Sequence, residues 1–199
     1  AIYMTGINDI LVKNIKIFEV NSSGSGKFAV YGISNVNVTL YNNTITTIGN
    51  TAHAISFTTT DNSTFDSNLI RTTNANAYGI QFTAGSVGNL IKNNNITLIG
   101  GSSRGISLST FSSDPDYTTI INNTILTTNT SSNGTRIESN HNFFINNSII
   151  TVGNASMGLS ITQYGNNSFI NNSIRTSGVR AYGIILESSC RIPEVGPPS

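Results

Sequence analysis

The hexapeptide FINNSI occurs twice in this chain, at residues 144–149 and again at residues 169–174. Four other segments share its pattern, which is a large apolar residue, two positions, Asn, one position and then Ile. They are LYNNTI (40–45), FDSNLI (65–70), IKNNNI (91–96) and IINNTI (120–125). The closing residues are Ile45, Ile70, Ile96, Ile125, Ile149 and Ile174, so one coil follows another at a nearly constant interval. A repeat of this length is typical of solenoid proteins.

A second, shorter motif keeps the same register and begins with Ala or Gly. It reads AVY (29–31), AIS (54–56), GIQ (79–81), GIS (105–107), GTR (134–136), GLS (158–160) and GII (183–185). The interval is longest from Gly105 to Gly134, and in the first motif it is longest from Ile96 to Ile125. Because two independent motifs lengthen in the same coil, we interpret them as parts of one structural repeat.

The repeat predicts short β-strands rather than helices. Each motif is short and rich in β-branched residues, and the segments between motifs are rich in Gly, Asn, Ser and Thr, which form turns. A coil of about 25 residues cannot bury an apolar face alone, whereas stacked coils pair each strand with its equivalents at about 4.8 Å. We therefore predict an all-β chain, a single parallel β-helix of about seven coils over residues 1–189, followed by a Pro-rich tail over residues 190–199.

The second asparagine of each long motif is predicted to form an inward ladder along the solenoid. Stacked amides can donate to and accept from one another, which satisfies polar groups away from water. The members of this structural ladder are Asn43, Asn68, Asn94, Asn123, Asn147 and Asn172. One coil before the first long motif, the same interval makes Ile15 and Val20 interior and puts Phe18 at the asparagine position. Residues 1–20 are therefore interpreted as a degenerate first coil.

These motifs resemble the repeats of right-handed parallel β-helix proteins, the pectate-lyase-like superfold. The N-N-[T/S]-I coils are most similar to those of secreted and cell-surface, adhesin-like proteins of archaea and bacteria. The resemblance covers roughly residues 10–188 and implies a right-handed helix. It leaves function open, because the fold hosts lyases, hydrolases, adhesins, tailspikes and scaffold proteins.

Composition excludes several classes of function. Charged residues make up 10% of the chain and the net charge is +1, with Lys and Arg scattered, so no nucleic-acid partner is expected. The apolar runs are all too short for a transmembrane helix, so no membrane insertion is expected. The single cysteine, Cys190, excludes an intrachain disulfide and a thiol-rich metal site. No cofactor is expected.

Two sets of polar residues are candidate sites. Asp114 and Asp116 form the one local acidic pair, which fits a turn better than a metal site. Glu138 and Glu187 share one column two coils apart, or about 9.6 Å, which is marginal for an inverting glycosidase. Arg136 lies on the same strand as Glu138. β-Helix enzymes that this chain resembles gather carboxylates and a Lys or Arg on one outer face and act on acidic polysaccharides. We nevertheless interpret these three residues as ordinary surface.

Twelve N-x-[S/T] sequons suggest N-linked glycans on a secreted chain. They begin at Asn21, Asn37, Asn42, Asn62, Asn95, Asn122, Asn129, Asn133, Asn146, Asn154, Asn166 and Asn171. The start at Ala1 without a signal peptide fits a mature secreted chain or a cytosolic one. Apolar residues 1–10 and the Pro-rich tail suggest a fragment of a longer surface protein, or stacking on copies of itself through the ends.

The sequence thus favours a non-catalytic extracellular or cell-surface structural protein. It would be an adhesin-type β-solenoid whose copies stack end to end as a filament. The alternative is a carbohydrate-active or carbohydrate-binding β-helix, for which Glu138, Glu187 and Arg136 are the candidate residues.

Overall fold

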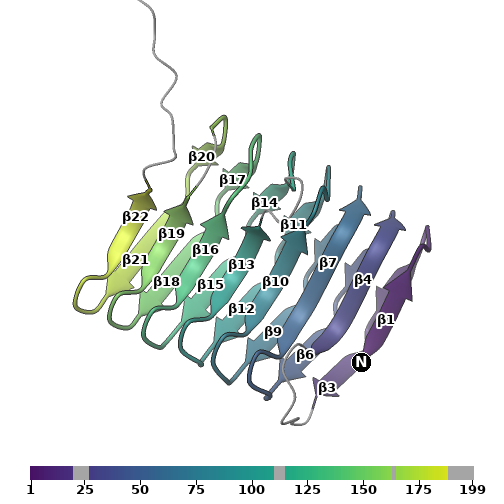
Figure 1. The fold of residues 1–199 in the computed structure, drawn as a ribbon, viewed down its shortest axis with the longest axis horizontal. Helices are drawn as coiled ribbons and strands as arrows, with labels where there is room; N and C mark the ends of the chain where they lie inside the picture. The colour runs from purple at the N-terminus through teal and green to yellow at the C-terminus, as the bar shows by residue number, and fades with distance from the viewer. Residues whose placement is uncertain (20–26, 110–114, 163–164, 188–199) are drawn as a thin grey trace, which may run out of the picture.

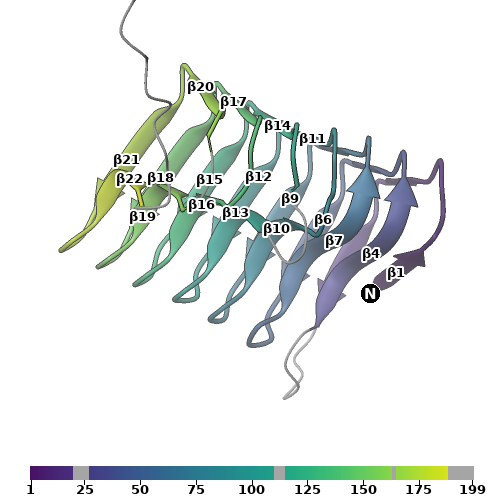
Figure 2. The same ribbon diagram turned by 45° about the horizontal axis from the view of Figure 1, so that its top comes forward.

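The chain forms a solenoid of about seven turns built from three parallel β-sheets (Figure 1). The computed structural model describes residues 1–19, 27–109, 115–162 and 165–187. Successive coils stack so that equivalent strands lie side by side, as both Figure 1 and Figure 2 show. The predicted all-β parallel solenoid, with its near-constant length of coil, is confirmed.

Each coil contributes one strand to each sheet in turn. Sheet A contains β1 (Ile2–Thr5), β4 (Phe28–Val36), β7 (His53–Asp61), β10 (Tyr78–Thr83), β13 (Arg104–Ser109), β16 (Asn133–Ile137), β19 (Met157–Ile161) and β22 (Tyr182–Leu186). Sheet B contains β2 (Leu11–Lys13), β5 (Thr39–Tyr41), β8 (Thr64–Asp66), β11 (Leu90–Lys92), β14 (Thr119–Ile121), β17 (Phe143–Ile145) and β20 (Ser168–Ile170). Sheet C contains β3 (Lys16–Glu19), β6 (Thr44–Thr47), β9 (Leu69–Thr72), β12 (Asn95–Leu98), β15 (Thr124–Thr127), β18 (Ser148–Val152) and β21 (Ser173–Ser177). Among the described residues, no helix is long and apolar enough to cross a membrane.

The register of the first coil differs from the prediction. Ile17, rather than Val20, pairs with Ile45, so the first coil is longer than expected. Ile15 occupies the asparagine position, and its N–H donates to Oδ1 of Asn43 over 3.1 Å. The prediction of Ile15 and Val20 as the interior pair was therefore wrong. The physical reason is that the connection from β3 to β4 is longer than the one from β6 to β7, and a loop can lengthen without changing the strands it joins.

Corners of the coil place a residue in the left-handed conformation, and the next residue points inward. At the corner between sheets B and C, Asn42 has φ = 52° and Asn122 has φ = 56°. Asn tolerates this conformation better than most residues. The motif therefore divides its two roles, because the first asparagine turns the chain and the second forms the ladder.

The predicted asparagine ladder is confirmed. The backbone N–H and Nδ2 of Asn94 both donate to Oδ1 of Asn123, over 2.9 and 3.0 Å, and the same Nδ2 donates to the carbonyl of Phe65 in the preceding coil. The equivalent side-chain bonds link Asn43, Asn68, Asn94, Asn123, Asn147 and Asn172 in order. Two shorter polar ladders, which were not predicted, run along the corner between sheets A and B, one from Ser63 to Asn89 and one from Thr118 through Asn142 to Asn167.

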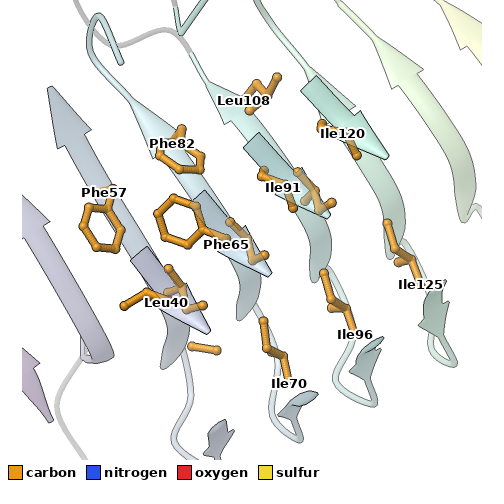
Figure 3. Close-up of a cluster of buried hydrophobic side chains, with 14 of the residues drawn as sticks. Leu40, Phe57, Phe65, Ile70, Phe82, Ile91, Ile96, Leu108, Ile120 and Ile125 are labelled. Atoms are coloured by element: carbon orange, nitrogen blue, oxygen red, sulfur yellow. The ribbon is translucent and has the colours of Figure 1, made fainter. Parts of the chain in front are cut away.

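The interior between the sheets is filled by apolar side chains that repeat from coil to coil (Figure 3). Ile70, Ile96 and Ile125 form one fully buried column from sheet C. Phe57 and Phe65 pack edge to face, with ring centroids 5.1 Å apart. These columns fix which side of each strand faces outward, and so they position the outward residues described below.

Candidate functional site

The outward face of sheet A carries rings and charged side chains in adjacent coils. One column, at the strand starts, contains Phe28, His53, Tyr78, Arg104, Asn133, Met157 and Tyr182. The next contains Tyr3, Tyr31, Ser56, Gln81, Ser107, Arg136 and Ser160. The third contains Ile33, Thr58, Thr83, Ser109, Glu138, Thr162 and Glu187.

Rings on this face stack along the solenoid axis, and we call this set the ring ladder. It consists of Tyr3, Tyr31, Phe28, His53 and Tyr78. The ring centroids lie 5.6 Å apart between Tyr3 and Tyr31 and 4.4 Å apart between Tyr31 and Phe28. They lie 5.4 Å apart between Phe28 and His53 and 4.4 Å apart between His53 and Tyr78. Four successive coils thus present one continuous row of rings.

His53 is held as a neutral ring near pH 7. Burial, and then the positive charge of Arg104, lower the pKa of His53 to about 4. Its Nδ1 accepts a hydrogen bond from the backbone N–H of Tyr78 over 3.0 Å. Because Nδ1 is an acceptor, the proton of the neutral imidazole is on Nε2. His53 therefore offers an N–H donor on this face.

Charged groups follow the ring ladder directly in the next two coils. The guanidinium of Arg104 lies over Tyr78, 5.0 Å from the ring centroid. Burial lowers the pKa of Arg104 from its ordinary value, and although Tyr78 acts in the opposite direction, the positive charge of Arg136 adds to the lowering. Nε of Arg136 lies 2.6 Å from Oε1 of Glu138, and these side chains are 30% and 15% exposed. Two cations and one carboxylate therefore lie together on or just after β13 and β16.

Hydroxyl groups lie beside and beneath these charges. Ser107 is fully buried although it is on the outward side of β13, and its Oγ lies 2.7 Å from Oγ of Ser109. Thr58 and Thr83 are bonded through their hydroxyls over 2.8 Å. Such groups both donate and accept hydrogen bonds.

Glu187 shares the column of Glu138, as the sequence predicts. The backbone N–H of Thr162 donates to the carbonyl of Ile137, and that of Glu187 donates to the carbonyl of Ile161, both over 3.0 Å. Glu138 and Glu187 are thus two coils apart, with Thr162 between them. The Glu187 side chain is exposed, whereas Glu138 is mostly covered.

The acidic pair in the long coil is only partly described, because Asp114 lies outside the described residues. Asp116 accepts a hydrogen bond from the backbone N–H of Asn140 over 2.8 Å, and its Oδ2 lies 3.9 Å from Nδ1 of His141. His141 stacks on Tyr117 and is remote from His53 in the fold. The described part of the chain does not include Cys190. Within that part, there is no group of three or more His, Cys, Asp or Glu that could hold a metal ion.

Most of the predicted glycosylation sequons lie at exposed corners. Seven of their asparagines have a positive φ and are exposed: Asn37, Asn42, Asn62, Asn122, Asn146, Asn166 and Asn171. Asn95, Asn129 and Asn154 are also exposed, Asn133 is half-buried, and Asn21 lies outside the described residues. Glycosylation of these positions stays a prediction.

A cavity of about 240 Å³ lies at the last coil, away from sheet A's outward face. Its lining is mostly apolar and includes Phe144, Phe169, Ile174 and Ile184, with the amides of Asn171 and Asn172. The residues that line it include no titratable group.

Contacts between copies of the chain through the ends of the solenoid stay a prediction.

The ring ladder and Arg104 were not predicted from the sequence. Their signal is positional, because His53, Tyr78 and Arg104 each directly precede the small residue of the short motif. The residue type at this position varies from coil to coil, so a search for repeating columns passes over it.

Comparison with solved structures finds the same fold in an enzyme. DFA-IIIase from Arthrobacter chlorophenolicus A6 in complex with GF2 matches with a TM-score of 0.51 and 11% identity, over 92% of this chain and 62% of that one. The same enzyme without its lid matches with a TM-score of 0.44 and 10% identity, over the same shares of the two chains. No protein-family model and no curated protein matches the sequence. This chain thus spans less than two thirds of the length of DFA-IIIase.

This likeness corrects one prediction. The expectation of a protein without catalytic activity is contradicted, because the solved structure that shares the fold is that of an enzyme. That expectation was drawn from the columns that repeat in every coil. A site on a solenoid need not repeat, since the repeated residues serve the stack.

Proposed function

We propose that this chain is a carbohydrate-active β-helix that binds a glycan along the outward face of sheet A and hydrolyses it. The observation that carries the proposal is the Arg136–Glu138 pair. It places a largely covered carboxylate on a face of hydroxyls and amides, beside Arg104 and the ring ladder. Charged groups gathered on one face, among them Arg104 with its lowered pKa, are candidates for function.

The chemistry of the face suits sugars. Glycans present closely spaced hydroxyls, which need both donors and acceptors. Ser56 and Gln81 are bonded over 3.2 Å, and Thr58 and Thr83 extend the polar surface in the same two coils. Recognition sites of this kind use a small number of placed polar groups to fix orientation.

Glu138 and Glu187 are the proposed pair for hydrolysis. Carboxyl groups two coils apart are separated by about 9.6 Å, at the upper limit of the range for inverting glycosidases and far above that for retaining ones. Glu138, oriented by Arg136, takes a proton from water while the water oxygen bonds to the anomeric carbon. The bond from that carbon to the glycosidic oxygen breaks, and Glu187 gives its proton to the departing oxygen.

The fold-level comparison supports this proposal over an adhesin-type filament, because the solved structure that shares the fold is that of an enzyme. GF2, which the matched DFA-IIIase structure contains, is one candidate substrate among several. The proposal rests on the residues of sheet A.

The test is release of reducing ends from a panel of glycans, namely polygalacturonate, alginate, inulin and GF2. The wild-type protein is expected to cleave at least one member, and Glu138→Gln and Glu187→Gln are each expected to abolish cleavage. Asp66→Asn, on the outward face of sheet B, is the matched control and is expected to leave cleavage unchanged. If the wild type binds a glycan of the panel but cleaves none, the protein is a binding module and the proposed hydrolysis is wrong.

A further inference from the structure

From Phe28 to Tyr78, the ring ladder presents ring edges rather than ring faces to solvent. His53 and Tyr78 stack at 4.4 Å with 15° between their planes, and Phe28 and Tyr31 stack at 4.4 Å with 18°. Arg104 covers the remaining face of Tyr78. These stacked faces are therefore occupied by neighbouring groups, and no sugar ring can stack on them.

The edges of these rings carry polar groups without partners. Within the described residues, no hydrogen bond is made by the hydroxyls of Tyr31 and Tyr78 or by Nε2 of His53. All three side chains are half-buried, so they are fixed by the stack and yet reach solvent. Side chains held by packing lose little conformational entropy when they bind.

Polar groups recur at the spacing of the coils along this face. They belong to Tyr31 on β4, His53 on β7, Tyr78 on β10, Arg104 on β13, and Arg136 with Glu138 on or just after β16. Neighbouring coils are about 4.8 Å apart, which is close to the length of one sugar residue in an extended chain.

We infer that the substrate is a linear glycan that lies parallel to the solenoid axis and is recognised through the ring edges, with about one sugar residue for each coil from Tyr31 to Glu138. This inference rests on the proposed function and specifies its substrate class. The neutral His53 and the two tyrosines act as hydrogen-bonding groups remote from the reacting bond. Binding energy from such remote contacts can be used at the reacting centre.

The test uses Tyr→Phe substitutions, which keep the stacked ring and remove only the hydroxyl. Affinity is measured by calorimetry for galacturonate and fructose oligomers of increasing length, from two to about eight units. Tyr78→Phe is expected to weaken binding threefold to tenfold, the usual range for one net hydrogen bond. Tyr31→Phe is expected to weaken only the oligomers long enough to reach β4 from Glu138. Tyr41→Phe, on the outward face of sheet B, is the control and should change nothing.

The outcomes separate the two proposals. If the wild type binds oligomers but Tyr78→Phe and Tyr31→Phe bind as well as wild type at every length, edge recognition is wrong while the proposed function stands. Affinity that does not rise with oligomer length overturns the inference in the same way. If the wild type binds none of the oligomers and cleaves none of the panel, the proposed function itself fails.

Discussion

Nε of Arg136 lies 2.6 Å from Oε1 of Glu138, on the outward side of a strand whose inward residues, Thr135 and Ile137, are fully buried. Arg136 and Glu138 are two positions apart on or just after β16, so they project from the same face. The pair is only partly exposed and adjoins Arg104. Its geometry makes Glu138 a positioned carboxylate rather than a freely moving surface acid.

The Arg136–Glu138 pair should show measurable coupling in a double-mutant cycle. The variants are Arg136→Gln, Glu138→Gln and the double variant, each unfolded by urea. We expect a coupling of about 1 kcal/mol, the upper range for partly exposed pairs, and a smaller value at high salt. The Lys92–Asp66 pair, at 3.4 Å, is the comparison, because its exposure is similar. Zero coupling would mean that Arg136 does not hold the carboxylate.

Asn94→Ala should destabilise the solenoid strongly. The substitution removes the acceptor of two bonds from Asn68 and the donor of bonds to Phe65 and Asn123. Buried polar groups left without partners cost about 1–3 kcal/mol each, so we expect a loss of about 3 kcal/mol or more in the free energy of unfolding. Asn95→Ala, at the next and exposed position, should change it by less than about 0.5 kcal/mol. If both variants lose the same free energy of unfolding, the asparagine ladder does not stabilise the solenoid.

Gly105→Ala and Gly183→Ala should differ although they occupy one column. A Cβ at Gly105 would lie 2.4 Å from both the carbonyl oxygen of Gly134 and Cγ2 of Ile125, whereas a Cβ at Gly183 meets nothing within 4 Å. Overpacking costs about 1–3 kcal/mol. Thermal unfolding should therefore show a clearly lowered midpoint for Gly105→Ala and an unchanged or raised one for Gly183→Ala.

Acidification should destabilise the protein through His53. Its pKa is about 4 in the folded state and about 6.5 in the unfolded state, so the unfolded chain binds the proton more readily. Above pH 6.5, neutral His53 makes its full contribution to the free energy of unfolding. That contribution, up to about 3 kcal/mol, is lost as the pH falls from 6.5 toward 4. Denaturant unfolding over this range should show the slope, and His53→Phe, which keeps a stacked ring, should reduce it. An unchanged slope in the variant would contradict the assignment to His53.

Thr127→Val should be neutral or stabilising. Thr127 is fully buried on sheet C, and its hydroxyl has no hydrogen-bond partner among the described residues. Replacing such a hydroxyl with a methyl group of the same shape removes an uncompensated polar group. We expect a gain of up to about 1 kcal/mol in urea unfolding. Thr47→Val is the control and should be destabilising, because Thr47 donates to the carbonyl of Ala52.

The features that repeat in every coil could be predicted from sequence. The Asn43-to-Asn172 ladder and the short-motif register follow from one requirement imposed in each coil, so the same residue type recurs at the same spacing. The first coil was misaligned because the interval of the later coils was applied to it unchanged, although its connection from β3 to β4 is longer. Val12 and Ile17 are as apolar as the residues chosen, and only the pairing with Leu40 and Ile45 distinguishes them.

The candidate site could be predicted only in part. Glu138 and Glu187 were found because they are rare charges in one column, and Arg136 was found because it lies two positions before Glu138. The ring ladder was missed because Phe28, His53 and Tyr78 share no single residue type. Their relationship is stacking between successive coils, which appears only when the rings are placed in space.

The most direct test of the central claim is the anomeric configuration and rate of glycan cleavage, followed by NMR with the wild type and Glu138→Gln. The account predicts that the wild type releases a reducing end whose configuration is inverted relative to the bond cleaved. It also predicts that Glu138→Gln slows release by at least about 100-fold, as expected for loss of a general base. Release with retained configuration, or an equal rate for Glu138→Gln, would contradict it.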